Sequence, residues 1–438
     1  MGTWAAPGVG TGVAAGAAPG DRAVAELLAL SGQALPSLRR WAASEPDCGL
    51  ARALLTLATG DGLGDAELKA ELAVAYRDAQ AAGERQASVV YGVFLFTHRQ
   101  YALTADHLVG HFARWPADEV AGLMLGAFAA DADPAGRARG EALVEEQAAL
   151  AGPANWPWTS WLAAARAEQG RVRDAHRLAV RALEICPRSG VAAHALAHAE
   201  HELGTGRAGT EFLDAWLAAD PRAVQSRHLT WHAALHSIAC GDFADARRRA
   251  DAALSRSDVG MRAATNWRLL LAGQEPAGRN DPAHVRELLA GPGGMAEVFH
   301  TFNLALALAV EAATDDLHAL ARRAAADPRT EFRDVLAPVV RALAEITAGR
   351  PRAAADLLTD LGEAADRIGG VRVEREIIHD TLARALADAG EPARAAALLH
   401  DRVTARRHHV YEDLLLTPGG PVVSVDPAAD RRPPHTPA

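Results

Sequence analysis

The stretches Gly170-Arg-Val-Arg-Asp-Ala175 and Gly241-Asp-Phe-Ala-Asp-Ala246 decide the fold of this chain. The same pattern, a glycine followed five residues later by an alanine, recurs at Gly349-Arg-Pro-Arg-Ala-Ala354 and Gly390-Glu-Pro-Ala-Arg-Ala395. Such a glycine ends one helix in a left-handed cap, and the alanine lets the next helix approach closely. Proline signals such as Ile185-Cys-Pro187 and Ala219-Asp-Pro221 then end the second helix. The pattern predicts repeated helix-turn-helix pairs.

These signals predict an all-α fold, a TPR-like right-handed α-solenoid of stacked helix-turn-helix pairs. The expected pairs cover about 157–186, 191–219, 225–256, 261–290, 297–327, 331–362 and 373–407. Four regions are expected: a disordered N-terminal tail at 1–20, degenerate helical repeats at 21–150, TPR-like repeats at 151–416 and a disordered C-terminal tail at 417–438.

Composition narrows the class of protein. The chain has 438 residues, 49% of them hydrophobic, and a formal net charge of −10, which argues against nucleic acid as the main partner. The sequence contains no run of 18 apolar residues, so no membrane span is predicted. The three cysteines, Cys48, Cys186 and Cys240, form no C-x-x-C pair and fit a reducing compartment. Without a signal-peptide pattern at its start, the chain is expected in the cytoplasm, and its Ala- and Arg-rich composition is typical of a bacterium.

Histidines gather in two neighbouring segments, His194-Ala-Leu-Ala-His198-Ala-Glu-His201 and His228-Leu-Thr-Trp-His232-Ala-Ala-Leu-His236. Within each segment the spacing places the imidazoles on one face of a helix. His194 and His228 are 34 residues apart, as are His198 and His232, and 34 residues is the period of a tetratricopeptide helix pair. We therefore expect the two stripes to be neighbours on successive repeats.

These segments also carry a family resemblance. The motifs His194-Ala-Leu-Ala-His198, His228-Leu-Thr-Trp-His232-Ala-Ala-Leu, Gly241-Asp-Phe-Ala-Asp-Ala and Trp267-Arg-Leu resemble the tetratricopeptide repeat protein 38 family. The resemblance is specific over roughly 155–275 and diffuse over about 25–410. It implies a tetratricopeptide-like right-handed superhelix and supplies no biochemical role. His201, His236 and His379 extend beyond the family's pattern.

The first helix of each such pair lines the concave groove of a solenoid, so the sequence predicts a groove lined by histidines. The expected ligand-binding residues are His194, His198, His228, Trp231, His232, His236, Asn266 and His300. Asn266 and His300 extend the 34-residue register. The histidines also have a purely structural interpretation, because buried imidazoles can form hydrogen bonds with one another across the contact between two helices.

Two functions of different classes stay open. The favoured hypothesis is a binding module whose groove takes a peptide, a protein partner or a small acidic ligand, with no nucleic acid and no membrane, and homo-oligomer formation is left open. The alternative is an enzyme or metalloprotein in which His194, His198, His228 and His232 serve acid/base chemistry or bind a metal. No motif indicates a cofactor, since H-E-x-x-H and the P-loop pattern are absent.

A further histidine pair, His107 and His111, has i, i+4 spacing but no partner in the repeat register. The chain also lacks G-x-S-x-G, so the nucleophile elbow of the α/β-hydrolases is excluded. The sequence therefore names no nucleophile.

Overall fold

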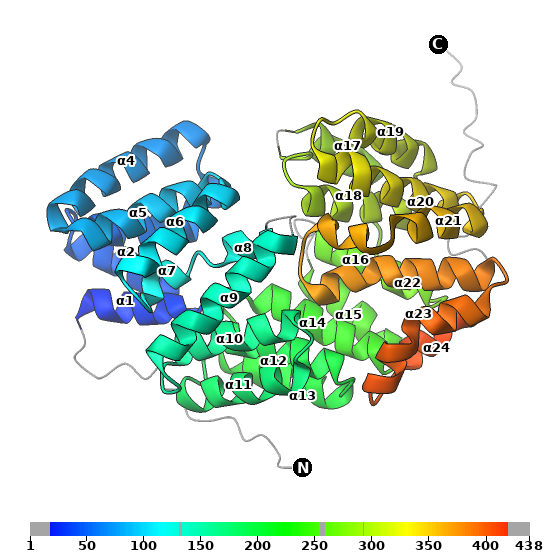
Figure 1. The fold of residues 1–438 in the computed structure, drawn as a ribbon, viewed down its shortest axis with the longest axis horizontal. Coiled ribbons are helices and arrows are strands. Elements are labelled where there is room, and N and C mark those ends of the chain that lie inside the picture. The colour runs from blue at the N-terminus through cyan, green and yellow to red at the C-terminus, as the bar shows by residue number, and fades with distance from the viewer. Residues whose placement is uncertain (1–17, 131–133, 255–258, 292, 419–438) are drawn as a thin grey trace, which may run out of the picture. The chain divides into compact units, whose positions relative to one another are not determined.

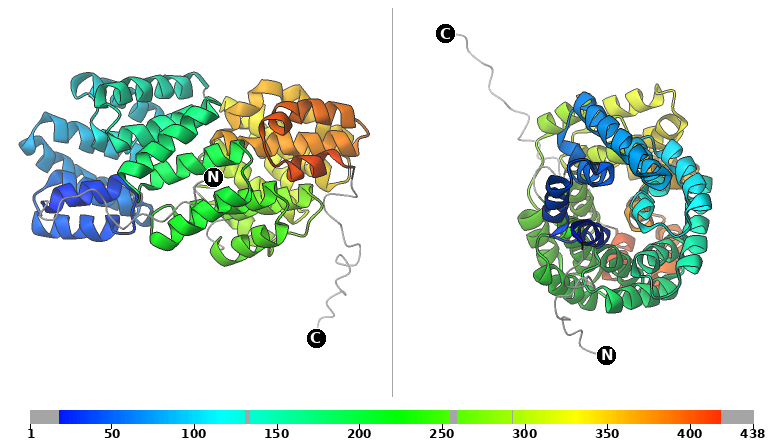
Figure 2. Two further views of the ribbon diagram at one scale, coloured as in Figure 1. Left: turned by 90° about the horizontal axis from the view of Figure 1, so that it is seen from below. Right: turned by 90° about the vertical axis from the view of Figure 1, so that its left-hand side faces the viewer.

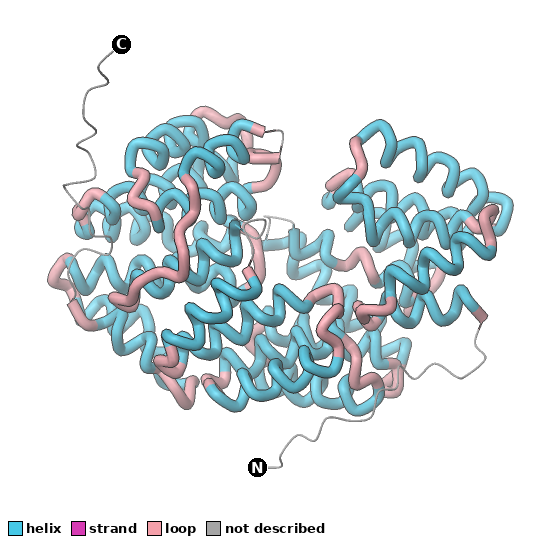
Figure 3. The backbone as a smooth tube through the Cα atoms, turned by 180° about the vertical axis from the view of Figure 1, so that it is seen from behind, coloured by secondary structure: helices cyan, strands magenta, loops and turns pink. Residues whose placement is uncertain are grey.

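A computed structural model describes residues 18–130, 134–254, 259–291 and 293–418 of the chain. Helices joined by short turns make up this described part, and no strand occurs in it (Figure 3). The all-α prediction is confirmed. Of the expected tails, residues 1–17 and 419–438 lie outside the described residues, while Pro19 and Gly20 already belong to the first helix.

Two compact units form. Unit 1 runs to Arg249 and includes the later segments Gly369–Arg375 and Arg402–His409. Unit 2 comprises Ala250–Ile368, Glu376–Asp401 and the residues from Val410 onward. The division between the units therefore lies at 249/250, inside the stretch where regular repeats are expected.

Most of the helices up to residue 253 are labelled in Figure 1. They are α1 Pro19–Leu28, α2 Ala34–Ser44, α3 Gly49–Thr59, α4 Asp65–Ala82, α5 Glu84–Thr97, α6 Tyr101–Arg114, α7 Glu119–Gly122, α8 Gly126–Ala130, α9 Pro134–Ala151, α10 Trp156–Glu168, α11 Val172–Ile185, α12 Gly190–Glu202, α13 Arg207–Ala219, α14 Ser226–Ala239 and α15 Phe243–Ala253. A short 3-10 helix, η1 Gly60–Gly62, follows α3.

The later helices include one π-helical turn, η2 Glu331–Leu336, and one 3-10 segment, η3 Gly362–Ile368. The α-helices are α16 Val259–Leu271, α17 Pro282–Ala290, α18 Val298–Val310, α19 Thr314–Ala325, α20 Ala337–Thr347, α21 Pro351–Leu361, α22 Arg372–Asp388, α23 Pro392–Ala405 and α24 Val410–Leu416.

Helices pack as neighbouring pairs (Figure 2), and four of the expected pairs are in contact: α10 with α11, α12 with α13, α18 with α19 and α20 with α21. The repeated glycines explain the turns: Gly170, Gly241, Gly349 and Gly390 all have positive φ, between 70° and 81°. Such angles favour glycine because it has no Cβ. The alanines five residues later, Ala175, Ala246, Ala354 and Ala395, are all fully buried. Close approach of the paired helices therefore depends on these small side chains.

Helix α12 is held at both ends within unit 1. Ser189 caps its start, its Oγ accepting from the Ala192 N–H at 3.1 Å, and the Gly190 N–H donates to the Ala29 carbonyl at 2.7 Å. At its far end the Leu203 carbonyl accepts from the Arg407 N–H at 3.0 Å. Segments distant in sequence thus fix the position of the helix that carries His194 and His198.

Unit 2 has its own buried contacts. The Trp267 indole on α16 donates to the Thr381 hydroxyl on α22 at 2.9 Å, and the Arg384 guanidinium donates to the Leu271 carbonyl at 2.8 Å. These bonds join α16 to a helix more than a hundred residues away in the chain. Among the described residues, no helix is both long and apolar enough to cross a membrane.

Candidate metal centre

The two histidine stripes lie on neighbouring helices of unit 1. His194 and His198 belong to α12, and His228 and His232 belong to α14. The two helices are in contact, and small buried side chains such as Ala195 and Ala233 allow that contact. The 34-residue spacing therefore brings the stripes side by side.

Three imidazole nitrogens form a closed triangle. The Nε2 atom of His194 lies 2.9 Å from the Nε2 atoms of both His228 and His232. The His228 and His232 Nε2 atoms are 3.1 Å apart. His198 joins the group from one side, since its Nε2 is 2.9 Å from that of His194. We call these four residues the histidine cluster.

Hydrogen bonding alone does not account for the triangle. In a neutral imidazole, a given ring nitrogen either carries a proton or offers a lone pair. Because each nitrogen has only these two states, at least two of the three Nε2 atoms must be in the same state. Those two either both carry a proton or both offer a lone pair, and neither combination forms a hydrogen bond. One side of the triangle is then repulsive unless a cation lies among the nitrogens.

The size of the triangle suits a transition metal. Zinc–nitrogen bonds of about 2.0–2.1 Å place tetrahedral ligand atoms about 3.3–3.4 Å apart, and right-angled ligands about 3 Å apart. The observed sides of 2.9–3.1 Å require shifts of only a few tenths of an ångström. His194, His228 and His232 together have the spacing of a metal-ligand set.

Burial keeps these imidazoles in the neutral form that binds metal. Loss of solvent holds the pKa of His194 and of His232 well below the ordinary value, and nearby imidazoles lower both further. Burial lowers the pKa of His228 to about 4. At neutral pH all three rings therefore carry a free lone pair.

The neighbouring carboxylates of α12 have other partners. A carboxylate oxygen of Glu200 lies 2.8 Å from the His176 Nε2, and Glu202 pairs with Arg372 and Arg406. The cluster is therefore an all-imidazole donor set. Such a set suits zinc, copper, nickel or iron.

Trp231 packs against the cluster. Its ring centroid lies 5.4 Å from that of His228 and 4.9 Å from that of His232. The indole is buried, so in this structure it contacts the imidazoles and forms a wall behind them.

His236 and His201 form a separate pair one helical turn farther along. Their ring centroids are 5.9 Å apart, and both rings are buried. Burial, with His201 as the next cause, lowers the pKa of His236 to about 3. The stripe is therefore continuous along α14, but the close Nε2 contacts are those of the histidine cluster.

Asn266 and His300 belong to unit 2. The Asn266 amide is engaged locally, since its Nδ2 donates to the Ala277 carbonyl at 3.0 Å and its Oδ1 accepts from the Ala277 N–H at 2.8 Å. These bonds fix the connection after α16. His300, near the start of α18, is exposed.

The structure brings together the four histidines that the 34-residue spacing places on neighbouring helices, but the sequence could not identify His194 as the common neighbour of the other three. That role depends on side-chain torsions and on the helix crossing, which the 34-residue period does not specify.

No protein-family model matches the chain, and no curated protein matches it.

Proposed function

We propose that this chain is a metalloprotein that binds a divalent transition-metal ion through His194, His228 and His232. The observation that carries the proposal is the Nε2 triangle with sides of 2.9–3.1 Å. A peptide-binding histidine has to present a ring nitrogen to its ligand. Here the nitrogens face one another, which favours the metalloprotein alternative over a histidine-lined peptide groove.

His198 is the candidate for a fourth ligand, because its Nε2 contacts that of His194, whereas the set with metal-ligand spacing is His194, His228 and His232. A four-imidazole set suits tetrahedral zinc, whereas three imidazoles would leave a coordination position for water or for a small acidic ligand. His198→Ala distinguishes these arrangements. If His198 is a ligand, its loss weakens zinc binding. If it lies outside the coordination sphere, zinc affinity is unchanged.

The proposed setting is a right-handed tetratricopeptide-like superhelix in the cytoplasm, with the centre on two successive repeats. Support comes from the 34-residue register and the paired helices. The metal would also link α12 to α14, and such a link stabilises the folded state by a free energy that grows with the logarithm of the metal affinity.

The first test is zinc binding by full-length protein purified without a histidine tag. We expect one equivalent to bind, and we expect His194→Ala, His228→Ala and His232→Ala each to weaken binding by at least about 100-fold, because each removes a nitrogen that would bind the metal. His176→Ala is the matched control: it removes a half-exposed imidazole of unit 1 that pairs with Glu200 and should leave zinc affinity unchanged.

Circular dichroism of each variant without metal checks that the helices remain. The proposal is wrong if the folded wild-type protein binds no zinc, copper, nickel or iron. It is also wrong if the three cluster variants bind zinc as tightly as the His176→Ala control.

A further inference from the structure

A second constellation lies in unit 1, on helices that the metal centre does not use. It is built by Ser88 on α5, His111 on α6, and Asp118 at the start of α7. The Ser88 Oγ lies 2.8 Å from the His111 Nδ1. The His111 Nε2 lies 3.0 Å from the Asp118 Oδ2. The three side chains form a continuous chain from hydroxyl through imidazole to carboxylate.

The chain has one consistent set of protons. Burial acts to raise the pKa of Asp118, but hydrogen bonds from His111 and Arg85 outweigh it, so the pKa lies below its usual value and the carboxylate stays charged. An ionised Asp118 accepts from the His111 Nε2–H. The Nδ1 lone pair then faces the Ser88 hydroxyl and can take its proton.

Asp118 and His111 are firmly held. The Asp118 Oδ1 accepts from the Val120 N–H at 3.1 Å as the cap of α7 and from Arg85 at 2.7 Å. The His111 ring is 2% exposed and packs against Trp115, with ring centroids 4.9 Å apart. A base held in this way needs little rearrangement to take a proton.

Ser88 faces an open pocket of about 530 Å³. Two exposed aromatic residues, Tyr76 and Tyr91, line this pocket, and their ring centroids are 6.3 Å apart. The charged residues of the lining pair with other groups: Arg114 with Glu84, and Asp106 with Arg139. The pocket therefore suits an uncharged substrate with an apolar or aromatic group.

His107 supplies a second imidazole beside the hydroxyl. Its Nε2 is 2.8 Å from the Ser88 carbonyl oxygen, to which it donates, and 3.3 Å from the Ser88 Oγ. Burial lowers the pKa of His107, so the ring is neutral at pH 7. The bond to the Ser88 carbonyl occupies the His107 Nε2–H and holds the neutral ring beside the Ser88 hydroxyl.

We propose that Ser88 is an activated nucleophile and that this pocket hydrolyses uncharged carboxylic esters with an apolar or aromatic acyl group. The Ser88 Oγ bonds to the acyl carbon while its proton passes to the His111 Nδ1. The bond from that carbon to the alcohol oxygen breaks, and His111 returns the proton to the departing alcohol. Water then releases the acid and restores Ser88. Asp118 is a positioning residue that holds the His111 tautomer.

Labelling by an alkyl fluorophosphonate tests the nucleophile directly in the full-length protein. In that reaction the Ser88 Oγ bonds to phosphorus, fluoride leaves and His111 takes the proton. We expect peptide mass spectrometry to find the adduct on Ser88. Ser88→Ala should abolish it, whereas the surface variant Ser44→Ala should label as the wild type does. His111→Gln should slow labelling by about 100-fold or more, the contribution expected of a general base.

Asp118→Asn separates positioning from structure, because asparagine keeps the helix cap but not the charge. With 4-nitrophenyl butyrate, we expect Asp118→Asn to lower kcat by about 100-fold or more and to change KM by less than about two-fold. A chelator should not change the wild-type rate, since the reaction is independent of the metal centre. Urea unfolding of each variant checks that it is folded.

The proposal is overturned if folded wild-type protein gives no adduct on Ser88. It is equally overturned if His111→Gln labels at the wild-type rate, or if Asp118→Asn leaves kcat unchanged. Any of these results would mean that the chain of contacts serves only to join α5, α6 and α7.

Discussion

At the level of single residues, the His236 ring fills the space that a side chain at Gly209 would occupy. A Cβ at Gly209 on α13 would lie 2.6 Å from a ring atom of the buried His236. Gly110 on α6 provides the opposite case, since a Cβ there would meet no atom within 4 Å. Both glycines lie inside helices, so the same substitution has opposite consequences at the two positions.

We predict that Gly209→Ala destabilises the protein by about 1–3 kcal/mol, the usual cost of overpacking a core. Gly110→Ala should instead stabilise it by about 0.5–1 kcal/mol, because alanine favours the helix. Urea unfolding of the two variants checks both signs. Equal effects of the two substitutions would refute the close packing of Gly209 on His236.

The ion pair of Asp327 with Arg329 makes the stability of the fold depend on pH. Hydrogen bonds from Arg329, at 2.7–3.0 Å, are the main reason that the pKa of Asp327 lies at about 2. An unfolded aspartate titrates near about 3.9. Because the folded pKa is the lower one, this pair stabilises the fold fully above about pH 4 and loses its effect as the pH falls towards 2.

We therefore expect Asp327→Asn to be less stable than the wild type at pH 7 and to approach it in stability near pH 2. Arg329→Met should give the same pattern, although it also removes the cation above the Phe332 ring. The free energy of unfolding in urea at both pH values measures the difference. A difference between wild type and Asp327→Asn that is the same at both pH values would contradict this account of the ion pair.

The sequence predicted which histidines are neighbours, because helix periodicity and a 34-residue repeat fix backbone positions. It could not predict the convergence of Nε2 atoms on His194, because that depends on side-chain torsions. It also gave no signal for Ser88 and Asp118 as partners of His111. Those residues lie on three different helices at spacings that match no motif.

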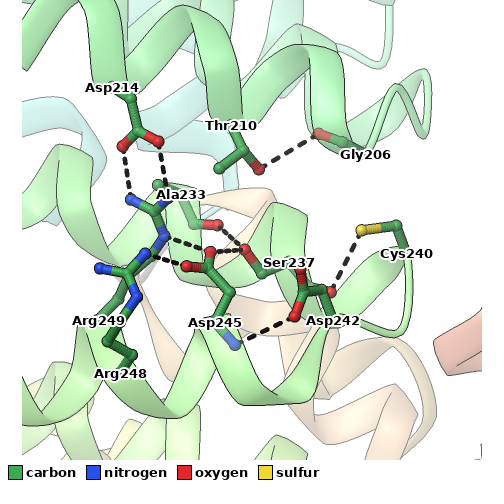
Figure 4. A network of polar contacts seen from close by, with 10 residues as sticks. All are labelled: Gly206, Thr210, Asp214, Ala233, Ser237, Cys240, Asp242, Asp245, Arg248 and Arg249. Carbon is green, nitrogen blue, oxygen red and sulfur yellow. Dashed lines mark hydrogen bonds and ion pairs between the residues drawn. The ribbon is translucent and has the colours of Figure 1, made fainter.

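At the level of helices, Arg249 joins α15 to its neighbours (Figure 4). Its guanidinium donates to Asp214 on α13 at 2.6 and 2.8 Å and to Asp245 on α15 at 2.6 Å. The Ser237 hydroxyl on α14 also donates to Asp245, at 2.7 Å. One buried cation thus connects α13 with α15 and, through Asp245, with α14, the helix that carries His228 and His232.

We predict that Arg249→Met destabilises the protein by roughly 2 kcal/mol. That is less than the cost of breaking a fully buried ion pair, because Asp214 is half-exposed. Arg181→Ala is the control, since its pair with Glu184 is exposed and should contribute less than about 0.5 kcal/mol. Thermal unfolding of both variants tests this ranking. If the control lost as much stability as Arg249→Met, the proposed role of Arg249 would be wrong.

The bounds of the helix pairs were predictable from α10 onward because glycine caps and proline stops mark nearly every end. The pairs expected at 191–219 and 225–256 correspond to α12 with α13 and α14 with α15. The helices before residue 150 were expected only as degenerate repeats. Their turns lack the repeated glycine–alanine pattern, and residues such as Arg99 and Ala117 take positive φ there without being glycine.

At the level of the whole molecule, local signals do not specify which distant segments join a unit. The segments Gly369–Arg375 and Arg402–His409 belong to unit 1, and their contacts with Glu168, Glu202 and Leu203 follow no repeat pattern. The helix type and pairing were thus predictable from the sequence. The division at 249/250 was not, because it arises from tertiary contacts.

In the proposed centre, His194, His228 and His232 bind one metal ion through their Nε2 atoms. X-ray absorption spectroscopy of the zinc-loaded, tag-free protein tests it most directly. We predict a first shell of three or four nitrogens at about 2.0–2.1 Å with the outer-shell scattering of imidazole rings. A first shell without imidazole, or a protein that retains no zinc after gel filtration, would contradict the claim.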